Sequence, residues 1–265
     1  MRTISSRQNP LVARYRAAAR GESRDVVLLD GAHLVSDAID AGVRIHEVAL
    51  TSEAADRPEV EAAVAPLTQG PTAVVAVSRR VMDALSPVRS ASGIVAIADR
   101  PGTPPDRVYD AATAMVVIGV DIQDPGNIGA IVRVAEAAGA TGFVAAGACA
   151  DPFGWKALRG SMGSALRLPI AVQPDPDRAI DHARRHGCRI VAAAPRDGRS
   201  VFEVDFCVPV AILIGSEGRG LPPVLVAGAD DRVTVPMRAP VESLNAAVTT
   251  ALILYEAFRQ RTAAT

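Results

Sequence analysis

The segment 236–245, Pro-Met-Arg-Ala-Pro-Val-Glu-Ser-Leu-Asn, carries three clustered polar side chains among residues that interrupt regular backbone structure. Glu242, Ser243 and Asn245 lie between an apolar strand predicted for 232–235 and the last predicted helix. Ser243 suits the N-cap of that helix, with Asn245 in its first turn, and this alone explains the segment when it is taken by itself. A plain connector needs no such polarity, so the segment is also a candidate site. The buried stripe predicted for the helix consists of Leu244, Val248, Ala251, Tyr255 and Phe258.

A second segment, 213–220, reads Leu-Ile-Gly-Ser-Glu-Gly-Arg-Gly and ends a predicted buried strand in a glycine-rich turn. Ligands of open α/β sheets bind at the carboxyl ends of strands, and glycines let a backbone approach a ligand closely. An ordinary turn with a solvated Glu217 is the alternative. Because a carboxylate flanked by glycines at a strand end is a less routine turn, we interpret the segment as part of a site.

A third segment, 121–133, reads Asp-Ile-Gln-Asp-Pro-Gly-Asn-Ile-Gly-Ala-Ile-Val-Arg. Asn127 is predicted to cap a helix, and Arg133 falls outside the apolar stripe of that helix, so it projects from a rigid element. The alternative is an ordinary exposed arginine. Gly126 and Gly129 would also suit a nucleotide-dependent enzyme, but they do not complete a Gly-x-Gly-x-x-Gly fingerprint. The stripe itself consists of Ile128, Ile131, Val132 and Ala135.

Strands and helices alternate along the whole chain, which indicates an α/β fold of two domains. Residues 1–98 form the first predicted domain, and residues 99–112, rich in proline and glycine, form a linker. Residues 113–265 form the second domain, whose continuous apolar runs predict a mostly parallel sheet. The predicted strands are 26–29, 43–50, 74–77, 93–98, 114–120, 142–146, 189–194, 210–215 and 232–235. The helices before the last one are 9–19, 31–41, 58–65, 79–85, 127–138, 153–162, 176–186 and 222–227.

The 265-residue chain has a net charge of −1 and is 49% hydrophobic, which indicates a soluble protein with a sizeable core. We expect a cytoplasmic location, since no apolar run approaches the roughly 20 residues of a membrane helix and no signal sequence is present. The arginines near the start form either an RNA-facing patch or a solvated helix face. They are Arg2, Arg7, Arg14, Arg16, Arg20 and Arg24.

Cysteines and histidines give no pattern typical of a metal site. Cys149, Cys188 and Cys207 lack metal-ligand spacing, and we predict that they are buried free thiols. His182 and His186 are four residues apart, but Arg184 and Arg185 lie between them, which indicates a solvated helix face. The sequence therefore predicts no metal.

The three segments, in this order, resemble the SpoU branch of the SPOUT RNA methyltransferases, the TrmH-like ribose 2′-O-methyltransferases. Residues 124–133, 214–220 and 235–245 carry the resemblance, and residues 4–10 and 29–33 are similar to the family's substrate-binding domain, which resembles ribosomal protein L30e. Two positions depart from the family pattern. Ala239 stands where the family usually has glycine, and Asp30 replaces the more usual glutamate.

The resemblance implies an L30e-like RNA substrate-binding domain followed by a SPOUT domain with a C-terminal trefoil knot. It also implies S-adenosylmethionine as cofactor and a homodimer formed through the knotted domain. The composition of the last helix agrees with a dimer, because Leu252, Leu254, Tyr255 and Phe258 spread over more than one of its faces. The residues that would bind the cofactor are Gly215, Val235, Met237, Leu244 and Ala194.

The activity implied is methyl transfer from S-adenosylmethionine to a ribose 2′-hydroxyl of RNA, with 23S rRNA as the substrate. A tRNA 2′-O-methyltransferase and a non-catalytic RNA-binding protein of the same fold are the alternatives. The family assigns the arginine matching Arg133 as general base. A guanidinium normally stays protonated, so orientation and charge stabilisation are the roles we expect. The catalytic residues implied are Arg133, Asn127, Glu217, Ser243 and Asn245.

Overall fold

The computed structural model describes residues 3–263, which form two compact units. The first unit comprises the chain up to Pro101 together with the segment Phe153–Arg167. The second unit comprises Gly102–Pro152 and the chain from Leu168 onwards. Within residues 3–263, no helix combines the length and the apolar character needed to cross a lipid bilayer.

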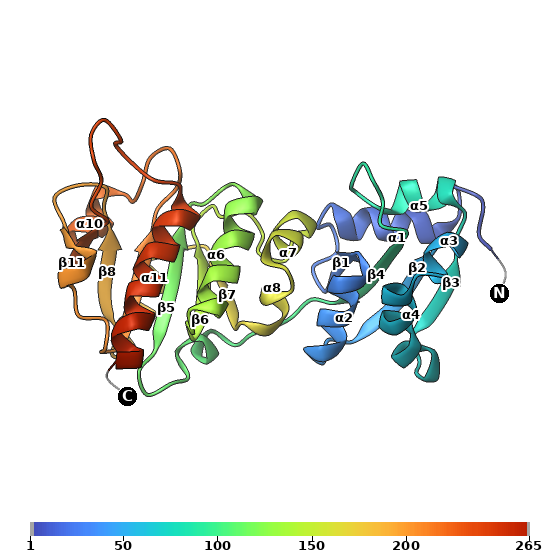
Figure 1. Ribbon diagram of the computed structural model, residues 1–265, viewed down its shortest axis with the longest axis horizontal. Helices are drawn as coiled ribbons and strands as arrows, with labels where there is room; N and C mark the ends of the chain where they lie inside the picture. Colours follow the sequence, from blue (N-terminus) through green and yellow to red (C-terminus); the bar gives the residue numbers. More distant parts are fainter. Residues whose placement is uncertain (1–2, 264–265) are drawn as a thin grey trace. The chain divides into compact units, whose positions relative to one another are not determined.

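A four-stranded mixed sheet with the order β1-β4-β2-β3 organises the first unit (Figure 1). β4 pairs antiparallel with both β1 and β2, whereas β2 and β3 are parallel. The strands are β1 (Val26–Asp30), β2 (Ile45–Leu50), β3 (Ala73–Ala76) and β4 (Ile94–Asp99). The helices before β4 are α1 (Pro10–Ala19), α2 (Ala32–Asp40), α3 (Ser52–Ala55), α4 (Pro58–Val64), η1 (Ala65–Gln69) and α5 (Arg79–Leu85).

Two helices from the middle of the chain complete the first unit, α7 (Trp155–Ser161) and α8 (Ser164–Arg167). Ala157 and Leu158 are fully buried, and Trp155 packs against the apolar core formed by α1, α5 and the sheet. An ion pair of 2.9 Å joins Arg167 to Asp37 of α2. The predicted methyltransferase range 113–265 is therefore not one contiguous unit. Sequence periodicity shows that a helix has an apolar face but not which domain covers it.

The second unit is built on a seven-stranded sheet with the order β7-β6-β5-β10-β8-β11-β9. Every pairing in it is parallel, which confirms the predicted sheet type. Two edge strands, β7 and β9, were not predicted from the sequence. The strands are β5 (Met115–Val120), β6 (Gly142–Ala146), β7 (Ile170–Gln173), β8 (Arg189–Ala193), β9 (Arg199–Ser200), β10 (Val210–Ile214) and β11 (Asp231–Thr234).

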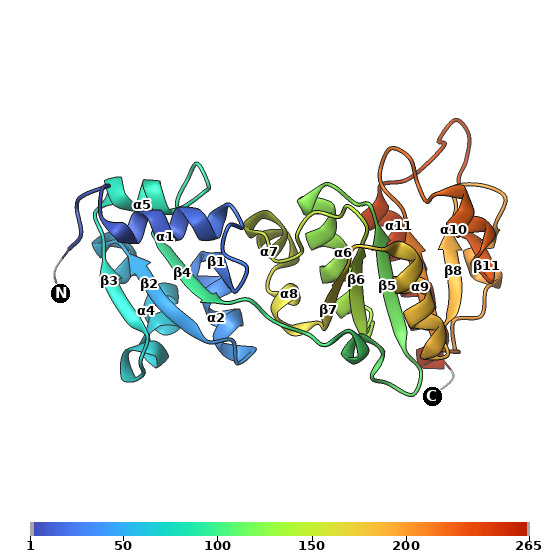
Figure 2. The same ribbon diagram turned by 180° about the vertical axis from the view of Figure 1, so that it is seen from behind.

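Helices cover both faces of this sheet (Figures 1 and 2). On one face α6 and α11 pack side by side. On the other face α9 and α10 bury apolar side chains against Val116, Ile118 and Val120 of β5. β5 is buried along its whole length, as expected of a parallel strand covered on both sides. The helices are α6 (Pro125–Ala137), α9 (Pro176–Arg185), η3 (Val201–Glu203), α10 (Pro223–Ala227) and α11 (Ala246–Ala263).

The predicted linker 99–112 is ordered in its second half. Residues Pro105–Tyr109 form a short 3-10 helix, η2. Val108 and Tyr109 are buried in the same apolar cluster as α9 and β5. Val108 and Tyr109 therefore belong to the core of the second unit, which the proline-rich composition of the segment did not indicate.

Both predicted helix caps are displaced. Asp124, not Asn127, caps α6, and its carboxylate accepts a 2.7 Å hydrogen bond from the backbone of Gly126. Asn245, not Ser243, caps α11 by accepting from the backbone nitrogens of Ala247 and Val248. Asparagine and aspartate cap as well as serine does, so propensity alone could not choose between neighbouring candidates.

The buried stripe predicted for the last helix is wrong, whereas the stripe predicted for α6 is confirmed. Val248, Tyr255 and Phe258 are exposed, and the buried side of α11 is instead formed by residues such as Thr250, Ile253 and Ala257. A helix with apolar residues on two faces offers two candidate stripes, and only the packing shows which one faces the sheet.

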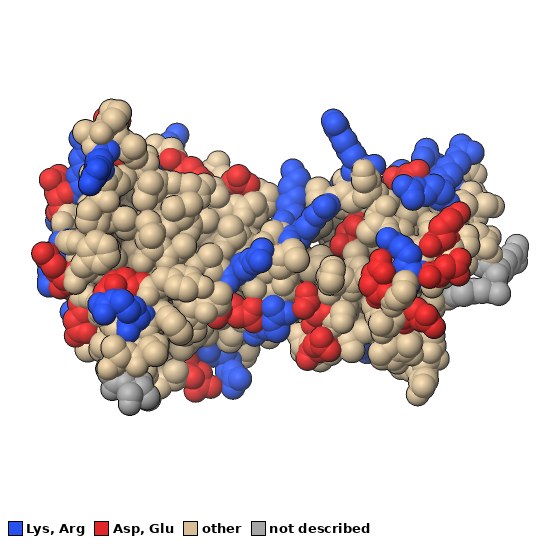
Figure 3. Space-filling view, in the orientation of Figure 1, with Lys and Arg blue, Asp and Glu red and all other residues tan. Residues whose placement is uncertain are grey.

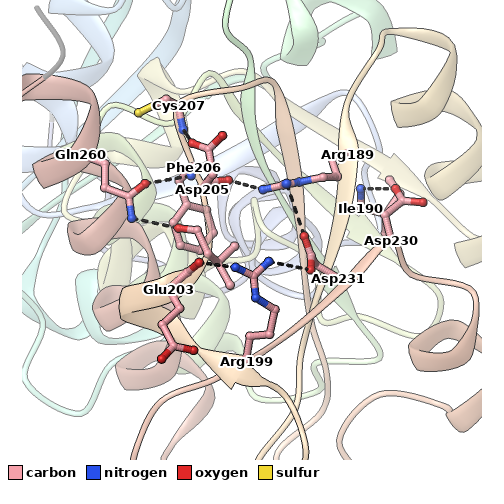
Figure 4. Close-up of polar contacts among 11 residues, drawn as sticks. Arg189, Ile190, Arg199, Glu203, Asp205, Phe206, Cys207, Asp230, Asp231 and Gln260 are labelled. Atoms are coloured by element: carbon pink, nitrogen blue, oxygen red, sulfur yellow. Dashed lines mark hydrogen bonds and ion pairs between the residues drawn. The ribbon is translucent and has the colours of Figure 1, made fainter.

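Polar contacts fasten the edge of the sheet to α11 (Figure 4). Asp231 of β11 accepts from Arg189 of β8 and from Arg199 of β9, at 3.4 and 3.3 Å. Gln260 of α11 accepts from the backbone of Phe206 and donates to the carbonyl of Val204, both at 2.9 Å. These contacts hold the segment before β10 in place and so help to fix the strand that leads into the candidate site.

All three cysteines are free, as predicted, but only Cys188 is fully buried. Cys149 is half-buried, and burial raises the pKa of its thiol, which indicates a packing role. Cys207 is exposed, contrary to the prediction, because it lies in the turn before β10 and not in the strand itself.

Candidate functional site

A cavity of about 320 Å³ lies at the carboxyl ends of β8, β10 and β11. Its walls come from three loops that are far apart in the sequence: 193–195 after β8, 214–221 after β10 and 235–246 before α11. Parallel strands end at the same edge of a sheet, so three strand-end loops converge there. The cavity contains all five residues predicted to bind a cofactor: Ala194, Gly215, Val235, Met237 and Leu244.

The loop after β10 is held in one tight conformation. The Gly220 backbone nitrogen donates to the carbonyl of Ser216 at 2.9 Å, and Gly220 has a φ of +64°, a conformation that favours glycine. At Gly215 a Cβ atom would overlap the carbonyl carbon of Gly220 and the backbone nitrogen of Leu221. Only glycine therefore fits at Gly215 while the loop keeps its shape.

Three of the predicted catalytic side chains meet beside this cavity. The Asn245 amide donates to the side-chain oxygen of Asn127 at 3.0 Å. The Asn127 amide in turn donates to the carboxylate of Glu217 at 2.6 Å. The donor-to-acceptor direction of these contacts is fixed. The Asn245 side-chain oxygen already caps α11, so only the Asn245 amide nitrogen can bond to Asn127. The helix cap thus orients a polar relay that ends on a carboxylate.

Ser243 and Arg133 lie outside this relay. Ser243 lines the cavity, and its side chain makes no hydrogen bond with another described residue. Arg133 projects from α6 as an exposed side chain, and within residues 3–263 it has no ion pair or hydrogen bond. A cation that the surrounding protein leaves unpaired is available to an anionic ligand.

The first turn of α6 does not offer a phosphate site. The carboxylate of Asp124 already accepts the backbone hydrogen bond of Gly126, and its negative charge repels a phosphate at this helix terminus. The nucleotide site considered for Gly126 and Gly129 is therefore not supported by the geometry.

A second cavity of about 620 Å³ lies on the other side of the loop 216–221. Asp121 and Gln123 line it together with the loop, and Glu217 borders both cavities. Asp121 has a φ of 54°, and its carboxylate accepts a 2.7 Å hydrogen bond from the backbone of Ala148. Asp121 and Gln123 were not predicted from the sequence as site residues, although both directly follow a buried strand, where ligands of open α/β sheets bind.

The lining of the first cavity suits a ligand that has a flat apolar part and a few polar edges. Ile214, Leu221 and Leu244 offer apolar surface, while the loop backbones offer hydrogen-bonding groups. The cavity is within the range of roughly 300–1,000 Å³ that small-molecule sites occupy. These properties fit an adenine nucleoside and leave the polar relay at its border for chemistry.

Residues 114–255 match the SpoU rRNA Methylase family. The chain is 30% identical to an uncharacterized tRNA/rRNA methyltransferase of Synechocystis sp., over 99% of this chain and 95% of that protein. It is 27% identical to the 23S rRNA (guanosine(2553)-2′-O)-methyltransferase RlmP of Bacillus subtilis, over 96% of this chain and 98% of that protein. The fold matches the AdoMet-bound crystal structure of the SpoU methyltransferase AviRb from Streptomyces viridochromogenes with a TM-score of 0.87 and 28% identity, over 96% and 99% of the two chains.

Proposed function

Since the chain belongs to the SpoU rRNA methylase family, we propose that it transfers a methyl group from S-adenosylmethionine to a ribose 2′-hydroxyl of 23S rRNA. The observation that supports this best is the convergence of the cavity and the polar relay at one edge of the sheet. The alternative of tRNA as substrate is less well supported, because RlmP, which matches over nearly its full length, is named for 23S rRNA.

Ala194, Gly215, Val235, Met237 and Leu244 are the residues we assign to holding S-adenosylmethionine. Their side chains are small or apolar, so recognition of the adenine ring falls to apolar contact and to the loop backbones. When bound, S-adenosylmethionine supplies an electrophilic methyl group on a sulfonium. The polypeptide contributes the walls that exclude water and the groups that orient the acceptor.

We assign the acceptor side of the reaction to Arg133 and to the relay. A 2′-hydroxyl is a weak nucleophile until its proton is drawn off as it attacks. Arg133 meets the hydroxyl and the adjacent phosphate and stabilises the developing alkoxide, while the hydroxyl proton passes to solvent water. Asn127, Glu217 and Asn245 form the fixed hydrogen-bonded wall beside it, and Ser243 offers its hydroxyl from the cavity rim. No step assigned here requires a metal.

The first unit is the part we assign to RNA binding, and the cytoplasm is the location expected for a protein that acts on rRNA. Figure 3 shows basic side chains gathered over α1 and α5. Several of these arginines have partners within the unit: Arg14 pairs with Glu47, Arg20 with Glu22, and Arg16 donates to the carbonyl of Ala84. Arg7 bonds to the carbonyl of Arg80, and Arg2 lies outside the described residues. The Arg20–Glu22 pair is exposed on both sides and can exchange for phosphate.

Incubating the protein with S-adenosylmethionine and unmodified 23S rRNA should produce one new 2′-O-methylated nucleotide. The prediction follows from the one relay described, Asn245–Asn127–Glu217, which borders the cavity assigned to the cofactor. Ribose methylation mapping along the rRNA measures it, with matched tRNA as the control substrate. Methylation of tRNA but not of rRNA would exclude the proposed substrate, and methylation of neither would favour the non-catalytic alternative.

We further propose that the protein is a homodimer formed through α11. Val248, Leu252, Tyr255 and Phe258 follow one another at helical spacing, and each keeps between 44% and 50% of its surface exposed. In Figure 3 much of the surface over this helix is uncharged. An exposed apolar stripe of this kind marks an interaction site, and two-fold symmetry would let it cover itself. Because α6 packs against α11, the partner would lie close to Arg133.

Light scattering at micromolar protein should therefore give twice the 27.5 kDa chain mass. Leu252→Glu should shift the protein towards the monomer, because it places a charge in the middle of the apolar stripe. Val224→Glu is the matched control, since Val224 is also an exposed apolar residue of the second unit, at 72%, but lies on α10. A monomeric parent protein, or an equal response to both substitutions, would contradict the proposed interface.

A further inference from the structure

Asp106, His182 and His186 form a cluster that the sequence did not predict. The Nε2 atoms of His182 and His186 lie 2.8 and 3.1 Å from the same carboxylate oxygen of Asp106. One nitrogen from each imidazole and the Asp106 oxygen are all within 4.8 Å of one another. The expectation of a solvated helix face is therefore incomplete: His186 is exposed, but His182 is half-buried and both imidazoles contact Asp106. Asp106 lies 76 residues before His182, so spacing along the sequence could not indicate the cluster.

The two imidazoles are held in place by stacking. The rings of His182 and His186 are 5.0 Å apart and nearly parallel, at 11°. Both also stack on the ring of Tyr109, at centroid distances of 5.2 and 4.7 Å. The exposed fraction of the side chain is 22% for His182 and 34% for His186, whereas it is 72% for Asp106. Both Nε2 atoms are thus directed at one carboxylate. Because Asp106 is mostly exposed, its side of the cluster is open to solvent.

We propose that Asp106, His182 and His186 bind one divalent transition-metal ion, with Zn²⁺ as the physiological candidate. Two imidazole nitrogens and a carboxylate are a ligand set that zinc accepts, with bonds of about 2.0–2.2 Å to each atom. A tetrahedral ion needs its ligand atoms roughly 3.3 Å apart. Both histidine–aspartate distances are slightly shorter than this, so small side-chain movements would admit the ion. Water would complete the coordination on the open side.

The charges in the cluster also suit a cation. Hydrogen bonds from His186 and His182 lower the pKa of the Asp106 carboxyl, so this group is ionised at neutral pH. An ionised carboxylate attracts a divalent cation. Arg185 and Arg184 lie on the same helix, but Arg184 is engaged with the carbonyl of Gly228 and with Asp230.

The site is structural and lies apart from the proposed catalytic centre. His186 directly follows α9 and precedes β8, so the cluster lies at the amino ends of the parallel strands, whereas the cavity lies at their carboxyl ends. In Figure 2, α9 lies in front of the sheet. A bound ion would fasten η2, the first ordered element of the second unit, to α9. It would stabilise the fold without entering the reaction.

Isothermal titration of the full chain with ZnCl₂ at pH 7.5 tests the proposal. Each protein should lack a polyhistidine tag and carry Cys207→Ser, because an exposed thiol binds zinc by itself. The parent should bind one Zn²⁺ per chain, and His182→Gln or His186→Gln should weaken binding at least tenfold. Binding should also weaken at pH 5.5, since imidazole must be neutral to coordinate a metal.

His46→Gln is the matched control, because His46 also contacts a carboxylate, Asp99 at 2.6 Å, but belongs to the first unit. It should leave zinc affinity unchanged. Thermal unfolding gives a second measurement: zinc should raise the Tm of the parent and of His46→Gln but not that of His182→Gln. Absence of zinc binding by the parent, or unchanged affinity in both His182→Gln and His186→Gln, would overturn the proposal.

Discussion

Replacing Arg133 by alanine should lower the rate of methyl transfer by about 10²–10³-fold, the loss expected when one preorganised charge stabiliser is removed. Folding, dimer mass and S-adenosylmethionine affinity should change little, because Arg133 is exposed and makes no ion pair or hydrogen bond with another described residue. Single-turnover methylation of 23S rRNA measures the rate of methyl transfer, and titration with S-adenosylmethionine measures the cofactor affinity.

Two further variants test whether the guanidinium itself is needed. Arg133→Lys should recover little activity, since an ammonium cannot reproduce the planar two-pronged contact with phosphate. Arg178→Ala is the matched control, because Arg178 is also an exposed helical arginine of the second unit, on α9, and should keep full activity. Wild-type turnover in Arg133→Ala would mean that Arg133 is an ordinary surface residue.

Gly215→Ala should weaken S-adenosylmethionine binding by on the order of 10²-fold, or about 3 kcal/mol. The added Cβ overlaps backbone atoms of Gly220 and Leu221, which cannot rotate aside as a side chain could. The loop that forms one wall of the cavity would have to move, and methyl transfer would fall with cofactor affinity. Calorimetric titration with S-adenosylmethionine measures the change directly.

Gly218→Ala provides the control within the same loop. A Cβ at Gly218 meets no atom within 4 Å, so cofactor affinity should remain within a few-fold of the parent. Thermal unfolding of both variants separates loss of the site from loss of the fold. If Gly215→Ala bound S-adenosylmethionine as tightly as Gly218→Ala, the cavity could not be the cofactor site.

The sequence by itself determined most strands and helices of the second unit and the apolar stripe of α6, but not the edge strands β7 and β9 or the short helix η2. Runs such as 114–120 are apolar throughout because parallel strands are buried on both faces, and this signal is local. The loop that carries Gly215 and Glu217 was also predictable from the sequence, because its glycines directly follow an apolar run of strand length. The trefoil knot rests on the resemblance to the SpoU family and remains a prediction.

The tertiary structure alone decided which of these residues meet. Asn127 and Asn245 are 118 residues apart, and Asn127 and Glu217 are 90 apart, yet they form one relay. Their contact depends on the order of the strands, because the loops after β5 and β10 and before α11 converge only when the sheet has formed. Periodicity cannot encode that order.

The outer face of α11, the placement of α7 and α8, and the Asp106 cluster have the same physical origin. An apolar or polar pattern shows that a helix face requires a partner but does not identify the partner. Val248 and Phe258 share a helix with the buried Ile253, and only the packing of α11 on the sheet leaves the first two exposed. Likewise, the stacking of Tyr109 on His182 required η2 to fold back onto α9, which no local signal in a proline-rich segment predicts.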